Sequence, residues 1–118
     1  MDRERIRRDF TAAVNMTAGE IRQWLGTEES RSVGWVPPGG GESVGHAAGR
    51  RIAAILSAPV RELGEGDYAM MRKAVGFIRR HRAQEPANPV TSRWRYSLMN
   101  WGCDPLRCGF ETEAGAKP

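Results

Sequence analysis

The sequence predicts an all-α protein, a single compact domain of about five helices with a Gly/Pro-rich loop between the second and third. Three observations support this prediction. Apolar residues recur at helical spacing in five segments, Ser, Thr or Asp stands at the start of most of them, and no segment alternates over the length of a strand. With 118 residues, the chain is long enough to enclose one hydrophobic core and too short for two.

The first two helices are predicted near the N-terminus. Segment 3–14 has apolar residues at helical spacing, with arginines on its other side. Thr17 and Glu20 then have the spacing of a capping box, in which each side chain satisfies a backbone amide at a helix start. A second helix follows this box, and Gly26 is a natural stop for it.

A long loop is predicted over residues 27–42. The pair Pro37-Pro38 removes backbone donors, and the triple glycine at 39–41 is costly to order. Both features disfavour regular structure. We expect segment 30–41 to be mobile in the free protein, because it offers few apolar anchors.

Three more helices are predicted after the loop. Ser43 caps the third, which ends before Pro59, and Asp67 caps the fourth, which runs to about residue 83. Thr91 or Ser92 starts the fifth, which ends near residue 102. The domain is expected to span residues 1–108, with a disordered tail at 109–118. The residues expected to be mostly buried are Trp24, Ile52, Ile55, Val75, Ile78, Leu98 and Trp101.

The charge balance favours a polyanionic partner. The formal net charge is +4, and 16 of the 18 basic residues are Arg, whose planar fork suits phosphate. Codon bias in a GC-rich genome is the alternative explanation of the Arg excess. No apolar run is long enough to cross a membrane, and no secretory signal is recognisable. We therefore expect a cytoplasmic protein with reduced thiols at Cys103 and Cys108, associated with the nucleoid if it binds DNA.

The fourth predicted helix has a basic face. At 100° per residue, its apolar arc lies opposite an arc of four cations around the small residues Ala69 and Gly76, with no carboxylate among them. This pattern indicates a negatively charged partner that approaches the backbone closely. The competing interpretation is that cations gather near a helix C-terminus because they interact favourably with its dipole. The four cations are Arg72, Lys73, Arg79 and Arg80.

The glycine-rich loop before the third helix is a candidate anion contact. Free amides at a helix start attract anions, and Gly45 and His46 would make such a contact with help from Arg50. The spacing of a nucleotide-binding P-loop is present, but His46 stands where that motif needs Lys. In the loop, Trp35 is expected to stack on a base or a partner's side chain, or to cover the core.

Catalytic and metal sites are poorly supported. Cys103 and Cys108 are spaced more widely than paired zinc ligands, and the two histidines fall in separate predicted helices. We expect no metal site and no cofactor, and we favour a non-enzymatic role. An enzyme built around segment 41–51 is a weaker alternative.

Three stretches carry a family resemblance: VNMT (14–17) with TEES (27–30) and SVGW (32–35), GESVGH (41–46) with GRRI (49–52), and WRYSLMNWG (94–102) with Asp104-Pro105. The chain resembles a family of uncharacterised bacterial and fungal proteins, classed as a domain of unknown function and often labelled DNA-binding. Members have His where this chain has Cys103. The second helix, loop and third helix also resemble small SAP-like DNA-binding modules.

Together these observations predict a small basic protein that binds duplex DNA through its backbone, non-specifically or with weak specificity. The alternative is a protein-interaction or stress-associated adaptor that docks a partner through the Gly/Pro loop and Trp35. A positive surface would favour DNA, and an apolar groove beside Trp35 would favour a protein partner. The expected phosphate contacts are Arg50, Arg51, Arg72, Lys73, Arg79 and Arg80.

Overall fold

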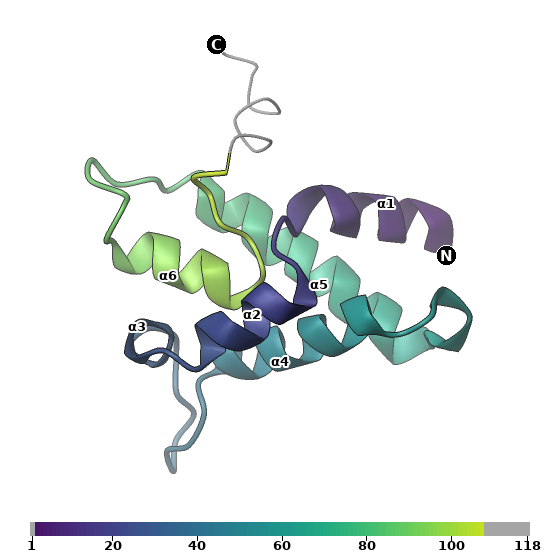
Figure 1. The fold of residues 1–118 in the computed structure, drawn as a ribbon, viewed down its shortest axis with the longest axis horizontal. Coiled ribbons are helices and arrows are strands. Elements are labelled where there is room, and N and C mark those ends of the chain that lie inside the picture. The colour runs from purple at the N-terminus through teal and green to yellow at the C-terminus, as the bar shows by residue number, and fades with distance from the viewer. Residues whose placement is uncertain (1, 108–118) are drawn as a thin grey trace.

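The computed structural model describes residues 2–107, and in this part of the chain it contains six α-helices, one 3-10 helix and no strand. The prediction of an all-α fold is therefore confirmed (Figure 1). The predicted tail at 109–118 lies outside the described residues. The elements are α1 (Arg3–Ala13), α2 (Ala18–Leu25), α3 (Glu28–Arg31), α4 (Val44–Ser57), η1 (Val60–Glu62), α5 (Glu65–Arg82) and α6 (Arg93–Asn100).

Side-chain caps set most of the helix starts. Thr17 and Glu20 form the predicted capping box, with the Thr17 Oγ1 accepting from the Glu20 amide and the Glu20 carboxylate accepting from the Thr17 amide. Ser43 caps α4 and Ser92 caps α6 in the same way, each accepting from the amide three residues ahead. Each hydroxyl satisfies an amide that has no partner inside its helix.

Two details differ from the prediction. The segment predicted as loop begins with the one-turn helix α3, because the Thr27 hydroxyl accepts from the Ser30 amide and nucleates a turn. Asp67 is not the N-cap of α5, which begins two residues earlier, after Gly64. The Asp67 carboxylate instead reaches back to accept from the Gly64 amide. A one-turn helix and the exact first residue of a longer helix are both too local to be marked by apolar periodicity.

The core lies between two helix pairs and α6. Helix α1 packs on α5, α2 packs on α4, and α6 contacts α2, α3, α4 and α5. Ile21, Ile52, Ile78 and Leu98 are completely buried at the centre. Of the seven residues predicted to be buried, six are, whereas Trp24 is half-buried against the edge of the core.

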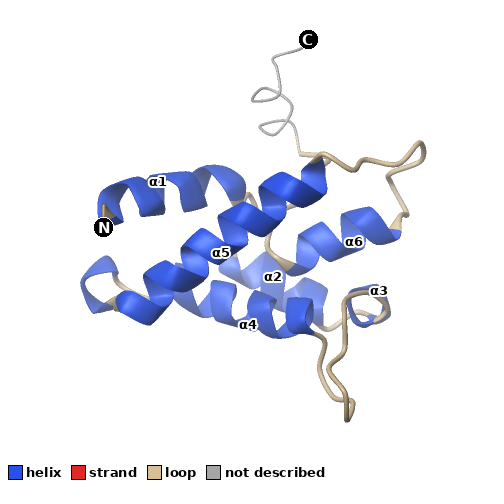
Figure 2. Ribbon diagram, turned by 180° about the vertical axis from the view of Figure 1, so that it is seen from behind, coloured by secondary structure: helices blue, strands red, loops and turns tan. Residues whose placement is uncertain are grey.

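The segment between α3 and α4 projects away from the helices (Figures 1 and 2). Its base is fixed, because Val33 is 3% exposed and the Val44 amide donates to the Trp35 carbonyl at 2.9 Å. Gly34 has a φ of +100° and lies so close to Ser43 that a Cβ atom would come within 2.9 Å of its Oγ. The expected mobility of 30–41 stays a prediction, but its two ends are packed against the body of the protein. Among the described residues, no helix is long and apolar enough to cross a membrane.

Candidate nucleic-acid interface

Helix α5 lies across the outside of the bundle, in front of α4 and α2 when the molecule is seen from behind (Figure 2). Its apolar side, which includes Met71, Val75 and Ile78, faces the core. The opposite side faces solvent and carries the four predicted cations, all of them exposed. Ala69 on this outer face is exposed and Gly76 is half-buried, and the Arg80 guanidinium lies against Gly76, 3.3 Å from where a Cβ atom would be.

Three of the four cations have no acidic partner in the described part of the chain. Within residues 2–107, no ion pair or hydrogen bond is found for the side chains of Arg72, Lys73 or Arg80. Arg79 faces Asp9 of α1, but the two charged groups are 3.9 Å apart and the Arg79 side chain is 64% exposed. Such a surface pair contributes little stability, so Arg79 remains available to another anion.

Grooves flank α5 on both sides. The groove between α1 and α5 is lined by Arg72 and Arg79 together with Asp2 and Asp9, so its charge is mixed. It also includes Arg5, a cation that was not among the predicted phosphate contacts. The N-terminal arginines alternate with acidic residues in the sequence, which gave no reason to single one out.

The groove between α4 and α5 has a different character. Arg50, Arg51 and Lys73 line it, and no acidic side chain of the described residues does. Arg51 donates to the Asp67 carboxylate at 3.1 Å through one nitrogen, which leaves other donors of its guanidinium free. The structure therefore gathers three predicted contacts in this groove, places Arg72 and Arg79 in the other, and leaves Arg80 on the outer face.

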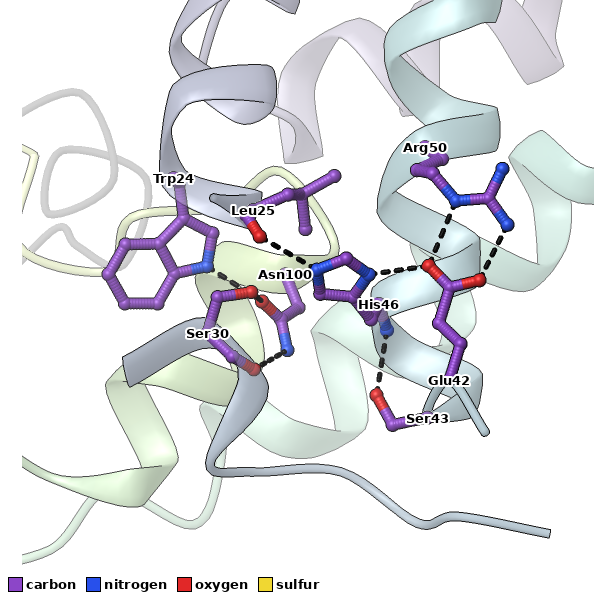
Figure 3. A network of polar contacts seen from close by, with 8 residues as sticks. All are labelled: Trp24, Leu25, Ser30, Glu42, Ser43, His46, Arg50 and Asn100. Carbon is purple, nitrogen blue, oxygen red and sulfur yellow. Dashed lines mark hydrogen bonds and ion pairs between the residues drawn. The ribbon is translucent and has the colours of Figure 1, made fainter. Parts of the chain in front are cut away.

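Arg50 belongs to a polar network at the start of α4 (Figure 3). It binds the Glu42 carboxylate through two nitrogens, at 2.9 Å and 2.5 Å, and His46 Nδ1 lies 2.5 Å from the same carboxylate. The Arg50 guanidinium and the His46 ring together lower the pKa of Glu42 to about 2. Glu42 is thus ionised at neutral pH and compensates much of the positive charge of Arg50.

His46 meets an acceptor on both sides of its ring. Its Nε2 is 2.8 Å from the Leu25 carbonyl oxygen, and its Nδ1 faces Glu42. Neither ring nitrogen is left free to take a proton from a substrate or to bind an external anion. This arrangement ties the end of α2 to the start of α4 and gives His46 a structural role that was not predicted.

A second network surrounds the fully buried Asn100 (Figure 3). Its Oδ1 accepts from Trp24 Nε1 at 2.7 Å and from Ser30 Oγ at 2.6 Å, and its Nδ2 donates to the Ser30 carbonyl at 3.1 Å. One amide therefore joins α2, α3 and α6. No short-range sequence signal could have predicted this network, because Ser30 and Trp24 lie 70 and 76 residues before Asn100 in the sequence.

The stretches that carried the family resemblance meet at these networks. Ser30 and Asn100 bond to each other, as described above. Asn15 bonds reciprocally with Asp104, donating to its carbonyl at 3.0 Å and accepting from its amide at 2.8 Å. Arg95 adds two bonds to the Asp104 carboxylate. These motif residues hold separate segments together.

Other candidate chemistry has little support in the described part of the chain. Residues 2–107 contain no group of three or more His, Cys, Asp or Glu side chains that could hold a metal ion. Cys103 is completely buried, and Cys108 lies outside the described residues. Trp35 is 65% exposed at the base of the projecting loop, and Gly45 is buried against Trp101.

The fold and this surface define a small all-helical protein with a cationic helix face. The family model "Protein of unknown function (DUF3140)" matches residues 9–99, which is most of the chain. The protein therefore belongs to this family. Neither the curated proteins nor the solved structures give a significant match.

Proposed function

We propose that the protein binds duplex DNA through its sugar-phosphate backbone, with the outer face of α5 as the principal contact. The observation that carries this proposal is the exposed trio of Arg72, Lys73 and Arg80, which have no ion pair with any residue of 2–107. A carboxylate at i,i+4 would stabilise such a cation on the helix, and these three cations have none among the described residues. Their charge is therefore available to phosphates.

The geometry of α5 suits a polyanion. Arg72 and Arg80 are separated by roughly 12 Å along the helix axis, a distance comparable with the width of the major groove. Ala69 is small and exposed, and the Arg80 guanidinium lies over Gly76, so a strand that approaches this face meets a cation there. Phosphate contacts carry no base information, so we expect weak sequence preference. Such a protein would act in the cytoplasm, close to the nucleoid.

The proposal concerns binding rather than catalysis. His46 has both ring nitrogens engaged within the protein, so it cannot serve as the base of the weaker enzyme hypothesis around segment 41–51 without breaking a contact. Among the described residues, the outer face of α5 presents cations and small residues and no nucleophile or carboxylate. Its chemistry is that of a phosphate contact.

The test is the salt dependence of DNA affinity in matched double variants. Replacing Arg72 and Arg80 with Ala should flatten the slope of log affinity against log salt by about 1.8, because each lost phosphate contact removes about 0.9. The control replaces Arg31 and Arg61, which are exposed on α3 and η1, and changes the net charge equally. An unchanged slope in the α5 variant, or an equal change in both, would contradict the proposal.

A second candidate function is docking of a protein partner. It is favoured by the exposed Trp35 and Val36, which are 65% and 45% accessible on the projecting loop. Aromatic residues exposed on a loop with a fixed base are typical of binding hot spots. If the intact protein shows no salt-dependent DNA binding, this adaptor function replaces the one proposed.

A further inference from the structure

We propose that the groove between α4 and α5 accepts one unpaired nucleotide, so that the protein prefers duplex DNA with a single-stranded overhang to blunt duplex. This inference rests on the proposed function and adds a second contact beside the α5 face. Lys73 belongs to both surfaces, since it lies on the outer arc of α5 and lines the groove. The groove is therefore continuous with the phosphate-binding face.

The groove has the size and floor of a small-ligand site. Its volume is about 540 Å³, within the roughly 300–1,000 Å³ of known ligand pockets. Alanines of α4 and the side chains of Met70 and Trp101 form an apolar floor. A planar base would bury its faces on such a floor without leaving charged groups unpaired.

The rim of the groove is cationic. Lys73 has no partner among residues 2–107, and Arg51 uses one donor on Asp67. Arg50 is largely committed to Glu42, which itself does not line the groove. Lys73 and Arg51 are thus the two cations best placed to hold the phosphate of a nucleotide whose base lies on the floor.

Trp101 supplies an independent observation. The indole N–H groups of Trp24 and Trp94 donate to Asn100 and to the His81 carbonyl, at 2.7 Å and 2.6 Å. The N–H of Trp101 donates to no group in the described part of the chain, although the residue is only 4% exposed. Because this N–H has no acceptor in the described protein, it is available to an acceptor on a ligand.

The surroundings of this N–H show that it remains reachable. Among the described side chains, the His81 Nε2 is the one completely buried nitrogen or oxygen without a partner. The Trp101 nitrogen therefore keeps some contact with solvent. It lies against Gly45, where a Cβ atom would come within 3.1 Å of it. Val44, the neighbour of Gly45, and Trp101 itself both line the groove.

These features together select a nucleotide that has left the base stack. A base within a duplex is paired and stacked, so it cannot lie flat on a groove floor. An unpaired base offers ring nitrogens and carbonyl oxygens as acceptors for the Trp101 N–H. Its phosphate falls next to Lys73, on the side where the duplex would contact α5.

The experiment compares the affinity of the full chain for a blunt duplex and for the same duplex with a single-stranded overhang. We expect the overhang to tighten binding about tenfold, which corresponds to about 1.4 kcal/mol. Ala47→Leu fills the α4/α5 groove and should abolish this gain while leaving blunt-duplex affinity unchanged. Ala54→Leu, at an exposed position of the same groove, is a second variant should the first fold poorly. The matched control is Ala12→Leu in the groove between α1 and α4.

The outcomes separate the two proposals. Equal affinity of the intact protein for both DNAs, or a gain that survives in the folded groove variants, overturns the nucleotide groove and leaves α5 binding intact. Absence of binding to either DNA overturns the proposed function itself. As a direct readout, the overhang should shift the NMR signal of the Trp101 indole N–H and leave that of Trp94 in place, because the latter is already bonded.

Discussion

Replacing Asn100 with Ala should destabilise the protein more than any exposed substitution. Asn100 is 1% exposed and bonds to Trp24, to the Ser30 hydroxyl and to the Ser30 carbonyl. Ser30 is completely buried, so the substitution leaves its hydroxyl and its carbonyl without a partner and out of reach of water. The Trp24 indole is half-buried and can recover a bond from solvent.

The magnitude follows from the two buried groups of Ser30 that lose their partner. A buried polar group without a partner costs about 1–3 kcal/mol, so the two Ser30 groups together predict a loss of about 3 kcal/mol. This is a large share of the roughly 5–15 kcal/mol of a typical domain. With a urea m-value of about 1.5 kcal/mol per molar, the unfolding midpoint should fall by about 2 M.

The assay is urea unfolding followed by far-UV circular dichroism, with Asn88→Ala as the control because Asn88 is exposed between α5 and α6. Ser30→Ala should cost less, about 1 kcal/mol, since it leaves the bond between Trp24 and Asn100 in place. The double variant should then lose less than the sum of the singles. A loss for Asn100→Ala of about 0.5 kcal/mol, as for a surface site, would refute the reasoning.

Three further predictions concern stability. Gly49→Ala should lower the free energy of unfolding in urea by about 1–3 kcal/mol, because the new Cβ would collide with the Asn100 backbone carbonyl. The control, Gly19→Ala, lies at an open helical position and should cost nothing. Equal effects of the two substitutions would contradict this reasoning. Glu42→Gln should lower the free energy of unfolding by about 1 kcal/mol at pH 7 and leave it unchanged near pH 2. The lowered pKa of Glu42 means that its contribution to stability is complete above pH 4.5 and is lost as the pH falls toward about 2. An equal cost at both pH values would rule this out. Burial lowers the pKa of His81, so its contribution to the free energy of unfolding is complete above pH 6.5 and falls on acidification. His81→Phe should therefore weaken the pH dependence of the melting temperature. An unchanged pH dependence would exclude this mechanism.

The local elements were predictable because their signals are local. Thr17 and Glu20 specify a capping box within one turn, and Ser43 and Ser92 mark helix starts in the same way. The apolar periodicity of α5 correctly separates its buried face from its exposed one. Helix α3 escaped prediction because a single turn has no periodicity to detect.

The pairing of charges was less predictable. The spacing of Glu42 and His46, four residues apart at a helix start, could have indicated their contact, and Arg50 lies one turn further on. The proximity of Arg79 to Asp9 could not have been found, because it depends on how α1 packs on α5. The helical wheel therefore identifies the cationic face, but the fold decides which of its cations stay unpaired.

The most direct test of DNA binding through α5 is the salt dependence of the intact protein's affinity for blunt duplex. If Arg72, Lys73 and Arg80 contact phosphates, log affinity should fall linearly with log salt, with a slope of about −2.7 or steeper. Affinity should also be similar for unrelated sequences, because backbone contacts do not read bases. Absence of binding at low salt, or binding that does not respond to salt, would contradict the account.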